Sequence, residues 1–165
     1  MKFSEFKYER PNFDQYKATM TSLIDQFKVA SSASEQLNIV TEINETRNHI
    51  ETMATLASIR HSIDTRDEFY DAEQNYWDEY GPLYEEINSL FYDAVVSSPY
   101  RNELEEKLSK QFFTILDYRL KAFSPEIIAD LQEENKLSSQ YTKLLASAKI
   151  PFDGEERTLP GMGKY

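Results

Sequence analysis

Apolar side chains recur along most of this chain at the spacing of an α-helix. The first run begins two residues after Pro11 and repeats at intervals of three and four residues. Its members are Phe13, Tyr16, Met20, Leu23 and Phe27. Because an α-helix completes one turn in about 3.6 residues, these side chains share one face of a predicted amphipathic helix. Pro11 suits the start of that helix, since a residue in the first turn needs no backbone N–H.

A second and longer apolar stripe follows a short polar break. The break, "ASSAS" at residues 30–34, ends with Ser34 as a candidate N-cap. The stripe beyond it runs as far as Ile63 and includes Val40, Ile43, Ile50, Ala54 and Ala57. So short a connection predicts an antiparallel helical hairpin over residues 1–63. Because the second helix is the longer one, we expect its far end to pack against another part of the chain.

Residues 64–149 predict three further packed helices. The first begins near Thr65 and contains Gly81–Pro82, a pair that we expect to kink or break it. The apolar period then resumes at Leu83, Ile87, Leu90 and Ala94, and Pro99 ends it. The next stretch is predicted as one helix with apolar positions at Leu104, Leu108, Phe112, Ile115 and Leu116.

The last predicted helix has a clear start signal. Ser124 is a candidate N-cap, and Pro125 occupies the first helical position. Apolar positions recur at Ile128, Leu131, Leu145 and Ala148. The middle of this helix, "QEENKLSSQ" at residues 132–140, is polar. We therefore expect that section to be exposed or to meet a polar partner.

The final residues, 150–165, predict a small β-hairpin and a tail. Asp153–Gly154 is a two-residue turn signal, because both central positions of the favoured hairpin turn need positive φ. Ile150 and Phe152 alternate ahead of the turn, and Thr158 and Leu159 follow it. The predicted fold class is therefore mainly α, with an N-terminal helical hairpin, further packed helices and a terminal β-hairpin. We treat residues 1–165 as a single helical region.

Composition narrows the classes of function. The chain has 165 residues, 40% of them hydrophobic, which is enough for one domain with a sizeable core. Its net charge of −11, without a basic patch, argues against binding nucleic acid or anionic membranes. It has no cysteine, which excludes disulfides and thiolate zinc sites and fits a reducing compartment. The first residues do not resemble a signal peptide, so we expect a cytoplasmic protein.

The two histidines do not predict a metal site. His49 and His61 lie 12 positions apart on one predicted helix. That places them about 18 Å apart and about 120° around the helix from each other, so they cannot bind one ion. Neither belongs to an H-E-x-x-H motif or a Glu-x-x-His pair. We expect both to be surface or half-buried residues, and the sequence predicts no catalytic, cofactor-binding or metal-binding residue in this chain.

An acidic and aromatic segment is the most unusual part of the chain. Residues 67–86 contain eight acidic residues and no basic one, interleaved with Phe69, Tyr70, Tyr76, Trp77, Tyr80 and Tyr84. We favour an interpretation in which the rings pack the bundle while the acids face water. The alternative is a surface that meets a partner. Just before this segment, Arg60 and Asp64 are four residues apart, which predicts an ion pair on the helix surface.

Three stretches together resemble a known family. They are "FKYERPNFDQY", "ETMATLASIRHSIDTRDEFYDAEQNYWDEYGPLYEE" and "SPEIIADLQEENKLSSQYTKLLASAKIPFDGEERTL". The chain is similar to the front part of oligoendopeptidase F-like zinc metallopeptidases, which are relatives of thimet oligopeptidase. Intact members of this family are several times longer. The resemblance implies zinc chemistry on an H-E-x-x-H helix that this chain does not contain.

The resemblance implies a non-catalytic role for this region. It is expected to form one wall of the channel that admits short peptides, with the missing C-terminal catalytic part as its partner and zinc bound in the intact parent. The chain alone is expected to be inactive, and apolar surface left uncovered should lead it to self-associate, most simply as a homodimer. The alternative from another class is a free-standing acidic helical adaptor without catalysis.

Overall fold

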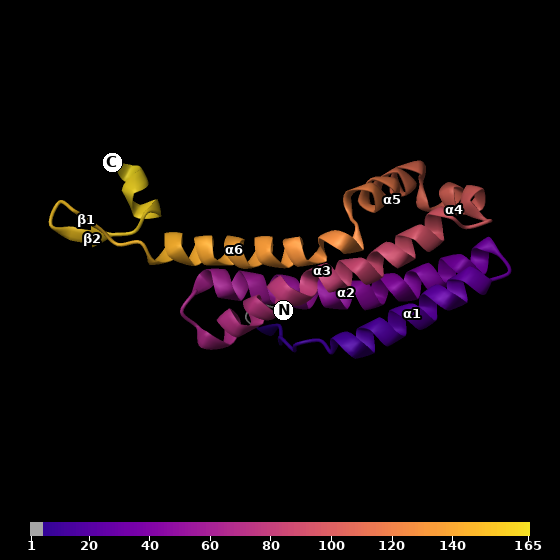
Figure 1. The fold of residues 1–165 in the computed structure, drawn as a ribbon, viewed down its shortest axis with the longest axis horizontal. Coiled ribbons are helices and arrows are strands. Elements are labelled where there is room, and N and C mark those ends of the chain that lie inside the picture. Colours follow the sequence, from indigo (N-terminus) through magenta and orange to yellow (C-terminus); the bar gives the residue numbers. More distant parts are fainter. Residues whose placement is uncertain (1–4) are drawn as a thin grey trace.

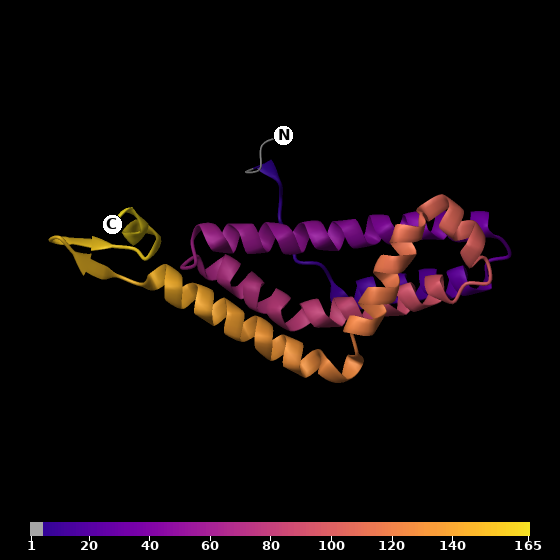
Figure 2. The same ribbon diagram turned by 90° about the horizontal axis from the view of Figure 1, so that it is seen from above.

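Three long helices form the body of the molecule. In the computed structural model, which describes residues 5–165, α1 (Phe13–Val29) and α2 (Ala33–Ile63) run antiparallel, and α3 (Glu68–Val96) lies against both (Figures 1 and 2). The elements that follow are α4 (Arg101–Leu108), α5 (Lys110–Ala122), the 3₁₀ helix η2 (Pro125–Ile127), α6 (Ile128–Ser147), the strands β1 (Ile150–Phe152) and β2 (Glu155–Arg157), and the 3₁₀ helix η3 (Pro160–Lys164). The predicted mainly α class, the helical hairpin and the terminal β-hairpin are confirmed.

The hydrophobic core lies between α1, α2 and α3, and α4 and α5 close one end. Its largest fully buried apolar side chains are Tyr92, Phe27, Phe91, Phe113, Met20, Ile43, Leu104 and Val95. The predicted stripe of α1 is confirmed, since every member except the half-buried Phe13 is buried. In α3 the prediction placed Leu90 on the apolar face, but Leu90 is exposed and its neighbour Phe91 is buried.

The far half of α2 packs against the segment that precedes α1. The Glu9 N–H lies 3.5 Å from Met53 Sδ, and Arg60 donates to the Phe6 carbonyl. The expectation that the end of α2 meets another part of the chain is thus confirmed. The predicted cap was wrong: Ser32, not Ser34, accepts a hydrogen bond from the Glu35 N–H at the start of α2.

Pro82 lies inside α3 and does not end it. A kink or a break was predicted here; the helix continues from Glu68 to Val96, so it does not break, and Figure 2 shows α3 changing direction along its length, as a kink would produce. Proline has no N–H to give to the carbonyl four residues earlier, which here belongs to Asp78. Asn135 Nδ2 on α6 donates to that Asp78 carbonyl at 3.2 Å, and Gln132 Nε2 donates to the next carbonyl, of Glu79, at 2.7 Å. The polar middle of α6 therefore meets a polar partner, which is the interrupted backbone of α3.

The predicted fourth helix is two helices. Ser109 separates α4 from α5 with a φ of 82°, a backbone conformation that a continuous α-helix does not allow. The Ser109 hydroxyl then accepts a hydrogen bond from the Phe112 N–H and caps α5. The prediction of one continuous helix was wrong because apolar spacing does not report a single residue that turns the backbone.

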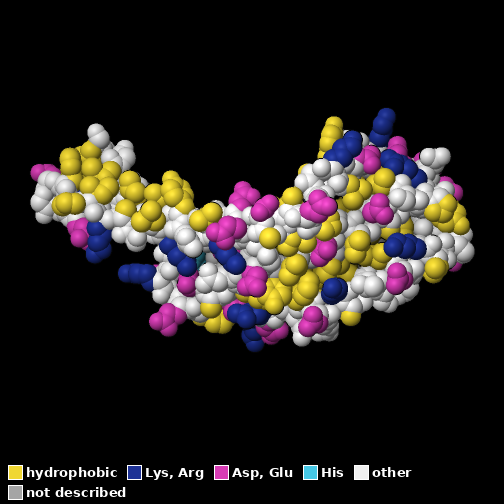
Figure 3. Space-filling view, viewed as in Figure 1, with side chains coloured by type: hydrophobic (Ala, Val, Ile, Leu, Met, Phe, Trp, Pro, Cys, Tyr) yellow, Lys and Arg dark blue, Asp and Glu magenta, His cyan; other side chains and the backbone are white. Residues whose placement is uncertain are grey.

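Residues 125–165, here named the C-terminal arm, lie beside the body and extend past it (Figure 1). The Ser124 hydroxyl accepts from the Glu126 N–H, which confirms the predicted cap. Asp153 and Gly154 form the predicted turn with φ values of 51° and 77°. The second strand is shorter than expected: Phe152 pairs with Glu155 and Ile150 with Arg157, so Thr158 and Leu159 lie outside it. Figure 3 shows hydrophobic side chains gathered over the arm.

Candidate functional site

The two histidines lie in different surroundings. His49 is exposed, as expected, whereas His61 is buried at 4% exposure, which corrects the expectation of a surface or half-buried residue. Its Nε2 lies 3.3 Å from Asp71 Oδ1 on α3. Within residues 5–165, no three His, Cys, Asp or Glu side chains come close enough to hold a metal ion.

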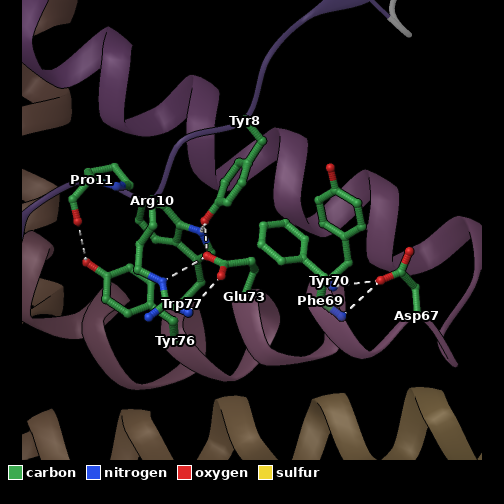
Figure 4. A network of polar contacts seen from close by, with 9 residues as sticks. All are labelled: Tyr8, Arg10, Pro11, Asp67, Phe69, Tyr70, Glu73, Tyr76 and Trp77. Carbon is green, nitrogen blue, oxygen red and sulfur yellow. Dashed lines mark hydrogen bonds and ion pairs between the residues drawn. The ribbon is translucent and has the colours of Figure 1, made fainter.

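A polar network attaches the segment before α1 to the first half of α3 (Figure 4). Tyr8 Oη donates to Glu73 Oε2 at 2.5 Å, and Arg10 contributes Nη2 to Glu73 Oε1 at 2.7 Å and Nε to Oε2 at 3.0 Å. Trp77 Nε1 donates to Tyr8 Oη at 3.2 Å. The Arg10 guanidinium also lies 4.8 Å from the centre of the Tyr76 ring. The two-pronged contact with Arg10 fixes both the position and the orientation of the Glu73 carboxylate.

Burial and hydrogen bonding compete at Glu73. Burial disfavours its charged form, but the hydrogen bonds from Arg10 and Tyr8 outweigh that effect and hold the pKa of the carboxyl below its ordinary value. Burial also raises the pKa of the Tyr8 phenol, and its hydrogen bond to Glu73 raises it further. Tyr8 therefore stays protonated and continues to donate. The network has the character of a structural clamp, since all the charges are paired within it.

A second ionic cluster joins α6 to the body. Lys143 on α6 forms an ion pair with Asp71 on α3, and His61 on α2 lies against the same carboxylate. Lys143 holds the pKa of the Asp71 carboxyl below its ordinary value, although burial opposes the effect. Three helices thus meet at one carboxylate, close to the end of α6 that leads into the hairpin.

The acidic and aromatic segment is only partly as predicted. Trp77 and Tyr84 are buried in the core, which fits the packing interpretation. The acids do not all face water, because Glu73 and Asp78 are each only 4% exposed. The Gln74 amide donates to Asp78 Oδ1 at 2.8 Å. The sequence did contain a signal that Glu73 would be buried. It lies four residues before Trp77 and eleven before Tyr84, which places it on the buried face of α3.

The predicted Arg60–Asp64 pair is replaced by other contacts. Asp64 Oδ1 pairs with Arg66 Nε at 3.1 Å, while Arg60 Nη1 donates to Tyr70 Oη at 2.6 Å.

Beside this loop lies a hollow of about 440 Å³ between the α2–α3 connection and the hairpin, with both acidic and basic side chains in its walls. Within the described residues, none of the helices is long and apolar enough to cross a membrane.

Comparison with known proteins identifies the family. Residues 3–123 match the model of the peptidase M3 N-terminal domain. The match extends over well more than half of the chain, and the chain therefore belongs to the peptidase M3 N-terminal domain family. No curated protein matches the chain.

Solved structures extend the similarity to the hairpin. An X-ray structure at 3.1 Å of a protein assigned as oligoendopeptidase F is 50% identical, with a TM-score of 0.96 over 100% of this chain. Pz peptidase A in complex with an inhibitor is 51% identical, with a TM-score of 0.96 over 99%. A protein from Bacillus anthracis str. Ames, also assigned as oligoendopeptidase F, is 47% identical, with a TM-score of 0.93 over 96%. This chain spans 29% of the length of each of the three.

Proposed function

We propose that this chain is the non-catalytic N-terminal region of a zinc metalloendopeptidase that hydrolyses short peptides, and that it forms one wall of the substrate channel. The observation that carries the proposal is the similarity of 47–51% identity over at least 96% of this chain. The matched region is only 29% of each relative, so most of each relative lies outside it. The cytoplasmic location expected from the sequence belongs to the same proposal.

The residues present fit a supporting role better than a chemical one. The described part of the chain offers no cluster that suits zinc, and its paired carboxylates are engaged in clamps between helices. We therefore assign no catalytic step to this chain. Its long helices suit a wall, since α2 with 31 residues spans about 45 Å at about 1.5 Å per residue.

A chimera tests the proposal. This chain would replace the matched region of Pz peptidase A, and hydrolysis of quenched fluorescent peptides of increasing length would be measured. The matched controls are the intact relative and the chain alone. We expect the chimera to cleave short peptides and the chain alone to cleave none. A chimera that folds and binds zinc but cleaves no peptide would contradict the proposal, as would zinc-dependent cleavage by the chain alone.

A further inference from the structure

Helix α6 presents its polar side to the body. The residues that contact α3 include Gln132 and Asn135, which bind the backbone carbonyls near Pro82, and Lys143, which pairs with Asp71. No residue in this fully described helix is buried. A helix that packs on a hydrophobic core normally turns its apolar side inward. Helix α6 departs from this rule after the half-buried Ile128 and Leu131: from Gln132 to Lys143 the side chains that contact α3 are polar, and two of them satisfy its interrupted backbone.

The apolar side of α6 faces outward. Leu137, Tyr141 and Leu144 are 54%, 62% and 67% exposed, and their spacing of four and three residues places them on one face. Leu145 adds a fourth exposed side chain at the edge of this face. Here this row of four residues is named the outer stripe. It carries no charge, in a protein whose net charge is −11.

The hairpin and tail carry further exposed apolar side chains beyond the outer stripe. The Phe152 ring packs against Tyr165, with ring centres 5.0 Å apart, yet the two side chains remain 40% and 66% exposed. Leu159 is 42% exposed. Figure 3 shows hydrophobic side chains along both α6 and the hairpin at this end of the molecule. Apolar groups that gather in this way on a surface commonly mark an interface.

We infer that the outer stripe, together with Phe152 and Tyr165, is the surface on which the rest of the peptidase chain packs. The inference rests on the proposed function and assigns the contact to one face of one helix. Two observations favour the rest of the peptidase chain as the partner that covers this surface. The three solved relatives match the chain through the hairpin, and each continues for about 71% of its length outside the matched region. The stripe also lies in the last part of the match, next to the hairpin.

An apolar partner surface fits this face better than a water-filled channel or a second copy does. A channel that admits varied peptides is wetted, whereas the centre of a lasting protein interface is depleted of charge and rich in apolar and aromatic side chains. A second copy would bring another net charge of −11 close to the first. The channel lining is therefore expected on a different face of the molecule.

The test compares one double substitution in two settings. Tyr141→Gln with Leu144→Gln removes the centre of the stripe, leaves the net charge unchanged and places a good helix former at each site. It would be introduced into the chain alone and into the chimera with Pz peptidase A. The matched control is Val29→Gln, which alters an 82% exposed apolar residue at the end of α1. The readout is the Tm, which does not depend on peptidase activity.

We expect the double substitution to shift the Tm of the chain alone by less than about 1 °C and to lower that of the chimera by at least about 3 °C. Val29→Gln should change neither. Equal shifts in both settings would overturn the inference even if the wild-type chimera cleaves peptides, so the outcome is separable from that of the proposed function. A dimer of the chain alone that the double substitution dissociates, with an unchanged chimera, would identify a second copy as the occupant and also overturn it. A wild-type chimera that does not fold counts against it too, since at 51% identity the two surfaces should fit.

Discussion

The body and the C-terminal arm of this protein are held in place by different forces. In the body, α1, α2 and α3 bury rings and branched side chains such as Phe27, Ile43 and Phe91 against one another. In the arm, no residue of α6 is more than half-buried, and the helix is attached by hydrogen bonds to backbone carbonyls and by the Lys143–Asp71 ion pair. Apolar burial contributes most of the free energy of folding, whereas a few hydrogen bonds and a partly exposed ion pair contribute much less. The body should therefore be stable by itself, and the arm should depend on whatever covers its outer stripe.

The largest difference should appear when an apolar side chain is shortened in each region. Phe91→Ala removes a fully buried ring and should lower the free energy of unfolding by about 3–5 kcal/mol. Leu144→Ala, at a site that is 67% exposed, should change it by less than about 0.5 kcal/mol in the chain alone. Urea unfolding followed by circular dichroism measures both. If the alanine variant does not fold, Phe91→Leu provides a milder change at the same site. Equal losses of stability at the two sites would show that the body and the arm do not differ in this way.

The clamp at Glu73 should have the next largest effect. Glu73→Gln weakens the hydrogen bonds with Arg10 and Tyr8 at a site where the carboxylate is buried, and should cost about 1–3 kcal/mol. The matched control is Glu79→Gln, because Glu79 is an exposed acid on the same helix. Urea unfolding of both variants is the measurement. If the two substitutions cost the same, the network of Figure 4 does not stabilise the body.

Acid should reduce the contribution of this clamp. The pKa of Glu73 is lower in the folded protein than its ordinary value, so the unfolded chain binds more protons there as pH falls. The stabilisation is complete well above the ordinary glutamate pKa of about 4.3 and is lost as pH falls through the folded value. The stability difference between wild type and Glu73→Gln should therefore shrink between about pH 6 and about pH 3. A difference that stays constant over this range would be inconsistent with the lowered pKa.

The contact between α6 and the interrupted helix should have a smaller and local effect. Asn135→Ala removes the donor to the Asp78 carbonyl, a hydrogen bond worth about 1 kcal/mol. The loss should speed amide exchange within α6. The global free energy of unfolding should change by no more than a few tenths of that roughly 1 kcal/mol. Asn48→Ala, at an exposed site within α2, controls for the gain in helix propensity. Hydrogen exchange read by mass spectrometry gives the result. Unchanged exchange in α6 would show that this bond does not hold the arm.

Local signals in the sequence were enough to predict most of the helices and the hairpin. The spacing from Tyr16 to Phe27 identifies the buried face of α1, and Asp153–Gly154 identifies the turn. These features depend on residues within one or two turns of each other, so a linear pattern contains them. The similarity of the three quoted stretches also pointed to the family that the comparisons confirm.

The contacts that join distant segments were not predictable in this way. Tyr8 and Glu73 are 65 residues apart, and Asn135 and Asp78 are 57 apart, so no local pattern pairs them. The split at Ser109 depends on one backbone torsion that apolar spacing does not encode. The outer stripe was not predicted for a different reason: the apolar positions that indicated the helix, Ile128, Leu131, Leu145 and Ala148, lie on both of its faces and so define no single stripe.

Native-state hydrogen exchange on the chain alone tests the central claim most directly. If the body is self-sufficient and the arm is not, amides in the second half of α3 should exchange only through global unfolding. Amides at residues 137–147 should exchange through much smaller openings that urea hardly affects. If α6 showed the same free energy of opening and the same urea dependence as α3, the arm would be as stable as the body without any partner, which would contradict the claim.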